Sequence, residues 1–366
     1  MISTKEKIST SQMITLLIST ILGVGILSLP RNLAEEVKGS GFIIIIISTF
    51  ICILFGYCIY KVIYRFQNET LMQISSNIIN KPIAYIICII YIFYYVVTIS
   101  IVTRIFVEVV KMYMLEKTPT EVIIISILLV CAYGSRKGIE GIARMSQIIF
   151  FLMMIPILFV FLFSLESADF TNLMPVFNVK LSQVFSSILT TNFSFTGFET
   201  MLILGIFMRK PKDGFKIQKI SLSVASFAYI FFTVISIAVF GQIETSHLMW
   251  PTLTMVKVID IPGAFLENLD ALIMGAWTLN IFITMCVYFF CSSLIMGDVF
   301  NCKEISYFNY AIVPIVYILA LYPENLAHLY DLLANKYIII LQLMIFAGIP
   351  FILFLFSKSS KRRKKA

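Results

Sequence analysis

Charged residues are scarce in this chain of 366 residues: Asp, Glu, Lys and Arg together make up 13%, about half the share typical of soluble domains. Hydrophobic residues make up 59%, and the mean hydropathy is +0.95. Long polar blocks and linkers rich in Gly, Ser or Pro are also missing. This composition excludes a soluble globular protein. We therefore expect a single transmembrane domain covering residues 1–366.

The residues that build common catalytic and metal sites are also few. The chain has only two histidines, His247 and His328, and none of its seven cysteines forms a C-x-x-C pair. It has neither a P-loop nor a G-x-S-x-G elbow. We therefore expect no disulfide, metal site, cofactor or enzymatic activity. The cysteines are interpreted as small buried hydrophobic residues.

Apolar runs of membrane-spanning length recur along the chain, since a spanning helix needs about 20 apolar residues. They lie at about 11–34, 41–64, 82–113, 120–135, 141–164, 184–208, 217–242, 268–297, 305–322 and 336–357. These runs predict an all-α integral membrane protein with ten transmembrane helices. Because five is an odd number, the second five helices start on the opposite side of the membrane, which predicts a 5+5 inverted repeat. The repeats are expected at about 11–164 and 184–357, followed by a basic tail at 358–366.

The basic residues predict the orientation, because cytoplasmic loops retain Lys and Arg. With the N-terminus inside, 20 of the 28 Lys and Arg residues fall on the cytoplasmic side. Both termini are therefore expected to be cytoplasmic. The basic tail is interpreted as an anchor on anionic membrane lipid. It is not expected to bind nucleic acid, since no folded basic domain accompanies it.

Two of the runs are interrupted in their middle. The first contains Gly23 and Gly25, and the sixth contains a polar stretch from Thr190 to Glu199 that includes Gly197. A helix can be broken inside a bilayer only where the freed backbone groups face a cavity or a polar ligand. The two positions correspond, so we predict broken helices 1 and 6 with a binding site between them. Close helix packing is the alternative explanation of the glycines.

The chemistry of such a site favours a small zwitterion. Exposed N-termini of half-helices favour a carboxylate, and unwound carbonyl groups suit an ammonium group or a cation. Glu199 is the most informative side chain, because an ionisable residue inside a span is costly and functional by default. It could bind an amine or a cation, or carry a proton. Alternatively, it caps the second half-helix and lies in water.

Other polar residues in the runs have less specific explanations. Arg104 and Glu108 are four residues apart on the third span and are expected to pair, with gating as the alternative role. Trp277 and Asn280 could line the cavity or serve packing. The outer segment 243–267 suits either a helix at the membrane surface or a lid.

Several motifs together resemble a known family. The opening motif, Gly23-Val24-Gly25-Ile26-Leu27-Ser28-Leu29-Pro30-Arg31, resembles the amino acid/polyamine/organocation transporter superfamily. Further stretches resemble the B-subunit family of bacterial spore germination receptors: Thr118-Pro119 with Glu121-Val122-Ile123, Gly138 to Arg144, Phe195 to Glu199, and Trp250-Pro251-Thr252-Leu253 through Ile259-Asp260, Leu269-Asp270 and Trp277. The resemblance covers nearly the whole chain.

The resemblance implies a germinant sensor in the inner spore membrane. Its partners would be a larger A subunit and a lipoprotein C subunit, and its ligand a nutrient such as an amino acid. The family's binding cavity maps here onto these residues: Gly23, Val24, Gly25, Ile26, Leu27, Phe195, Thr196, Gly197 and Glu199. An amino-acid permease remains the alternative, although the fifth span offers no buried amine for proton coupling between Met145 and Ser164.

Overall fold

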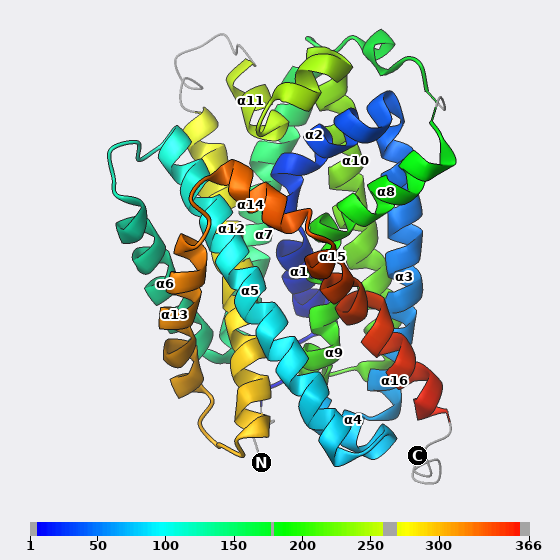
Figure 1. Cartoon of the computed structure of the whole chain (residues 1–366), viewed down its shortest axis with the longest axis vertical. Helices are drawn as coiled ribbons and strands as arrows, with labels where there is room; N and C mark the ends of the chain where they lie inside the picture. Colours follow the sequence, from blue (N-terminus) through cyan, green and yellow to red (C-terminus); the bar gives the residue numbers. More distant parts are fainter. Residues whose placement is uncertain (1–5, 177–178, 259–268, 359–366) are drawn as a thin grey trace.

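The computed structural model describes residues 6–176, 179–258 and 269–358, and within these ranges it consists of helices without β-strands (Figure 1). In chain order the α-helices are α1 (Thr10–Ile21), α2 (Gly25–Val37), α3 (Gly41–Arg65), α4 (Leu71–Ile78), α5 (Lys81–Tyr113), α6 (Thr120–Arg136), α7 (Gly138–Ser164), α8 (Leu181–Thr191), α9 (Met201–Leu204), α10 (Gly214–His247), α11 (Pro251–Val258), α12 (Leu269–Val299), α13 (Ser306–Leu321), α14 (Leu326–Leu333), α15 (Lys336–Leu343) and α16 (Ile349–Ser357).

The apolar runs expected from the sequence coincide with these helices. Runs one and six are each broken, the first into α1 and α2 and the sixth into α8, α9 and short 3-10 turns. Among the described residues, six helices are long and apolar enough to cross a bilayer, or seven if the bent pair α13–α14 is one span. The all-α membrane architecture with interrupted helices 1 and 6 is thus confirmed. The count of ten and the repeat boundaries stay predictions.

The core of the bundle surrounds α1, which lies in the middle of the bundle in Figure 1 and packs against α7, α10 and α12. Met13, Leu16 and Leu17 of α1 are fully buried. Large apolar side chains on the outward faces of other helices are open instead: Phe50 is 73% exposed and Ile148 is 71% exposed. Exposed apolar side chains on the outside of the bundle suit a lipid environment, because lipid does not require apolar surface to be buried as water does.

Both described ends of the chain lie at the same end of the bundle. The Lys7 ammonium donates to Asn68 Oδ1 over 2.8 Å, and Arg65 Nη1 donates to Ser357 Oγ over 3.2 Å. The turn after α3 therefore contacts the chain before α1, and the last residue of α3 contacts the end of α16. We call this the α4 end, which is lower in Figure 1, and the opposite one the α11 end.

Three short helices lie between the spans. Of the outer segment 243–267, α11 packs against α2 with Leu253 and Val256 buried. The surface-helix and lid interpretations of this segment both stay predictions. Ile259 and Asp260 lie outside the described residues. Neither α4 nor α14 was expected from the hydropathy. Each begins at a capping residue: Thr70 forms a capping box with Gln73, and Asn325 accepts from the backbone of His328.

A buried polar contact joins α6, α12 and α13. Asn309 Oδ1 accepts hydrogen bonds from Ser135 Oγ and Ser293 Oγ, and all three side chains are buried. Interhelical hydrogen bonds in membranes contribute about 0.6 kcal/mol each on average. The contact therefore helps to dock α13 onto the bundle.

Ser293→Ala is expected to lower the free energy of unfolding by about 0.6 kcal/mol, because it removes one donor to Asn309. Thermal unfolding in detergent measures the effect. The matched control is Ser292→Ala, because Ser292 is equally buried and its hydroxyl has no hydrogen-bond partner in the described part of the chain. An equal loss in both variants would contradict the assignment.

Candidate functional site at the broken helices

The first break is stabilised by side chains from two other helices. α1 ends at Ile21 and α2 begins at Gly25, which leaves carbonyl groups without helical partners. Asn280 Nδ2 of α12 donates to Leu22 O over 2.6 Å and to Ser19 O over 3.2 Å. Thr284 Oγ1 also donates to Ser19 O. Side-chain amides and hydroxyls thus replace the hydrogen bonds that a continuous helix would make.

The second break is centred on Gly197, which has a φ of 122° that L-residues with a side chain rarely adopt. 3-10 turns flank it at Asn192–Phe195 and Phe198–Thr200. Tyr229 of α10 connects the two breaks, because its hydroxyl contacts both Ile21 O, at 2.7 Å, and Ser194 O. Gln218 of the same helix donates to Phe198 O.

The two breaks are in direct contact. A Cβ atom on Gly25 would lie 2.6 Å from Ser194 Cα, and one on Gly197 would lie 3.0 Å from the backbone of Thr20. Gly23 is less restricted, since its nearest neighbour would be Thr284 Cγ2 at 3.5 Å. Close packing therefore explains Gly25 and Gly197. The other apolar members of the expected site are buried: Val24, Ile26, Leu27 and Phe195.

Glu199 lies beside the second break and is 0% exposed. Its Oε2 accepts from the Gly197 backbone over 2.7 Å, and its Oε1 accepts from the Tyr94 hydroxyl over 3.3 Å. No Lys, Arg or His of the described ranges forms an ion pair with it. The carboxylate thus caps the turn after Gly197, but in a dry environment. Thr196 beside it is also buried.

The remaining expected residues have separate places. Arg104 pairs with Glu108 over 2.8 Å and donates to Glu324 O, so it connects α5 to the turn before α14. Trp277 stacks on Phe106 with their ring centroids 5.8 Å apart. Asn280 alone of these residues contacts the first break. The printed contacts therefore connect Asn280 to the first break, and the gating or cavity role of the other three residues stays a prediction.

Three residues that contact the breaks were not expected from the sequence: Tyr94, Gln218 and Tyr229. Each is a polar residue in an otherwise apolar run. That signal is weak, because Tyr is common in the spans of this chain, which has 17 tyrosines. Only the tertiary contacts separate these residues from the rest.

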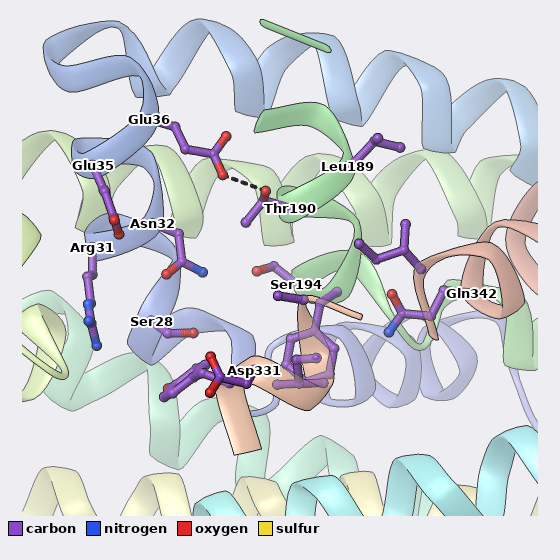
Figure 2. A pocket seen from close by; sticks show the side chains of 15 residues that line it. Ser28, Arg31, Asn32, Glu35, Glu36, Leu189, Thr190, Ser194, Asp331 and Gln342 are labelled. Atoms are coloured by element: carbon purple, nitrogen blue, oxygen red, sulfur yellow. Dashed lines mark hydrogen bonds between the residues drawn. The ribbon is translucent and has the colours of Figure 1, made fainter. Parts of the chain in front are cut away.

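A cavity of about 510 Å³ approaches the breaks from the α11 end. We call it the vestibule; α2, the α8 segment, α14 and α15 form its walls, and Figure 2 shows its lining side chains. Ser28 and Ser194 belong to the lining, so the vestibule reaches the edge of both breaks.

At the α4 end, the N-terminal segment is hydrogen-bonded to the chain that follows α9. Ile8 N donates to Phe207 O over 2.8 Å, and Arg209 N donates to Ile8 O over 3.0 Å, which forms a bridge like that between parallel strands. The Lys7 ammonium adds a contact to Ile206 O. A cavity therefore approaches the breaks from the α11 end, whereas at the α4 end the N-terminal segment is held against the chain after the second break.

The fold and the two joined breaks define a helical integral membrane protein with two broken helices, a fold that it shares with solved transporters. Similar solved structures include MhsT in complex with L-phenylalanine, with a TM-score of 0.71 and 11% identity, covering 95% of this chain and 88% of that one. Another is a Na⁺-coupled sialic acid symporter, with a TM-score of 0.64 and 13% identity over 96% of this chain and 79% of that one. At these identities the likeness shows the fold alone.

Within that class, the chain belongs to the family described as "Spore germination protein", whose profile matches residues 7–328. Spore germination protein YndE of Bacillus subtilis is 30% identical over the full length of both chains. Spore germination protein B2 of the same organism is 25% identical over 93% of this chain and 94% of its own. The resemblance read from the motifs is thereby confirmed.

Gly25→Ala is expected to destabilise the protein by about 1–3 kcal/mol, because the added methyl group overlaps the backbone of Ser194. Gly23→Ala is the matched control, with an expected change within about 0.5 kcal/mol. Unfolding temperatures of the two purified variants measure the difference. Equal stability would show that the breaks do not touch.

Proposed function

We propose that this chain is the nutrient-binding membrane subunit of a spore germination receptor, with a small nutrient, most simply an amino acid, binding between broken helices 1 and 6. The observation that carries the proposal is the pairing of two helix breaks beside a buried carboxylate that lacks a cation partner among the described residues. Family membership supports a role in germination. The fold of the amino-acid-bound MhsT structure is compatible with this ligand.

The proposed site consists of the residues expected from the sequence at the two breaks, with Tyr94 and Tyr229 added. A ligand ammonium group would pair with Glu199, since an opposite charge stabilises a carboxylate in a dry environment. Gly25 and Ser194 are in contact, so a ligand enters only when α2 and the turn at Asn192–Phe195 separate. That separation would be the conformational change passed to partner subunits.

The proposal places the chain in the inner spore membrane with the α4 end cytoplasmic. Lys7, Arg65 and Arg209 lie together at this end, where cytoplasmic basic residues belong. The A subunit and the lipoprotein C subunit are proposed as its partners, on the basis of the family resemblance. The role proposed for it is sensing without enzymatic catalysis.

Dipicolinate release tests the function directly. Spores with and without the gene would be challenged with single amino acids, sugars and nucleosides. Loss of the response to one nutrient class is the expected result, and it would name the ligand. Unchanged germination together with altered uptake of labelled amino acids by growing cells would contradict the sensor role and favour a permease.

Glu199→Gln is expected to raise the nutrient concentration for half-maximal germination about tenfold or more, because charged hydrogen bonds contribute about 1.5–3 kcal/mol. Membrane insertion should be unaffected, since the variant removes a buried charge. Tyr94→Phe should shift the response in the same direction.

Tyr95→Phe is the matched control for the tyrosine, because the Tyr95 hydroxyl is buried without a hydrogen-bond partner in the described ranges. Its dose response should equal that of the wild type. An unchanged dose response in Glu199→Gln would remove this carboxylate from the site.

A further inference from the structure

The vestibule is separate from the site expected at the breaks. None of the residues predicted from the sequence to bind ligand lines it. Its volume of about 510 Å³ lies within the range of small-molecule sites, about 300–1,000 Å³. Exposed lining residues such as Glu35 and Asp331 open it to the surface at the α11 end. A small solute can therefore reach it without any movement of the breaks.

Charges of both signs meet in this cavity. Arg31 is its cation, and Glu35, Glu36 and Asp331 are its carboxylates; Figure 2 shows them around one space. Glu36 is already engaged, because it accepts from Thr190 Oγ1 over 2.6 Å and so holds α2 against α8. The described residues place no ion pair on Arg31, Glu35 or Asp331.

Within the described part of the chain, the contacts of Arg31 leave its charge without a counterion. Its Nη1 lies 3.2 Å from Met249 Sδ, and its guanidinium carbon lies 5.9 Å from the ring centroid of Tyr330. A thioether and an aromatic face orient the group but carry no formal negative charge. The guanidinium fork thus remains suited to a carboxylate supplied from outside.

We propose that the vestibule is a recognition site for a zwitterionic amino acid, in which Arg31 binds the carboxylate and Asp331, aided by Glu35, binds the ammonium group. Leu189, Phe193 and Ile339 provide apolar surface for the ligand side chain. This inference rests on the proposed function, because it names where the nutrient binds before it reaches the breaks. A molecule with only one of the two charges leaves one vestibule charge uncompensated and binds more weakly.

The site is positioned to act on the breaks. Ser28 belongs to the first turns of α2, and Ser194 is the residue that contacts Gly25. An amino acid in the vestibule therefore lies against both parts that must separate. Its occupancy biases their arrangement to the extent that it binds one arrangement better than the other.

Binding to the full chain in lipid nanodiscs tests the proposal. The common L-amino acids are measured singly, and the one that binds most tightly is compared with its decarboxylated amine and its des-amino acid. Arg31→Gln should raise the Kd of the amino acid about tenfold or more. In this variant the amino acid should no longer bind more tightly than the amine. In Asp331→Asn, the amino acid should no longer bind more tightly than the des-amino acid. Arg31→Lys should retain part of the wild-type affinity for the amino acid.

Lys117→Gln and Glu116→Gln are the matched controls, because both residues lie in the loop between α5 and α6, outside the lining of the vestibule. Their Kd values should equal that of the wild type. If Arg31→Gln and Asp331→Asn also keep the Kd and the discrimination, the vestibule assignment is wrong, while the sensor function stands. If the wild type binds no amino acid, the ligand class is wrong. The germination response of spores that lack the gene is measured separately, and its loss would support the sensor function whatever the binding experiments show.

Thiol labelling gives a second measurement that does not depend on neutralised charges. Ala334 is exposed and lines the vestibule, so Ala334→Cys should be modified more slowly when the amino acid is bound. The native Cys302 is exposed outside the vestibule and serves as internal control in the same sample. Protection of Cys302 and the new cysteine alike, or of neither, would overturn the proposal.

Discussion

The need to satisfy backbone hydrogen bonds away from water controls this structure. Breaking two helices in a bilayer frees carbonyl and amide groups that lipid cannot bind. Here the replacements come from α10 and α12: Tyr229 contacts both breaks, while Asn280 and Thr284 serve the end of α1. These side chains fix which helices must surround the breaks. The central place of α1 follows from this requirement as much as from its apolar surface.

The sequence predicted what depends on local composition and missed what depends on contacts between distant segments. Gly25 and Gly197 were found because glycine interrupts an apolar run, and Glu199 because a carboxylate there is costly. Tyr229 carries no comparable signal, since its role exists only where α10 passes both breaks. A capping residue such as Asn325 before α14 is visible in the sequence, but an eight-residue helix is too short to be detected as a membrane span by hydropathy.

The vestibule shows the same limit from another side. Arg31 and Asp331 are 300 positions apart in the numbering, and nothing in their local sequence connects them. In the sequence, Arg31 stood out only as the last residue of the opening motif. The folding of α14 across the mouth, with α13 and α14 bent by 107°, brings Asp331 to the same cavity. A bent helix pair thus creates a site that no linear motif contains.

The two ends of the molecule differ in a way that gives the breaks a direction. At the α4 end the bridge between Ile8 and Met208 joins the N-terminal segment to the chain after the second break through backbone hydrogen bonds. At the α11 end a charged cavity ends at Ser28 and Ser194. A zwitterion from the vestibule would reach Glu199 only after Gly25 and Ser194 separate. Its charged contact with the buried carboxylate would then stabilise the separated arrangement. Under the proposed function, recognition in the vestibule would therefore precede conformational change at the breaks, so that the first step would select the ligand and the second would convert its binding energy into movement.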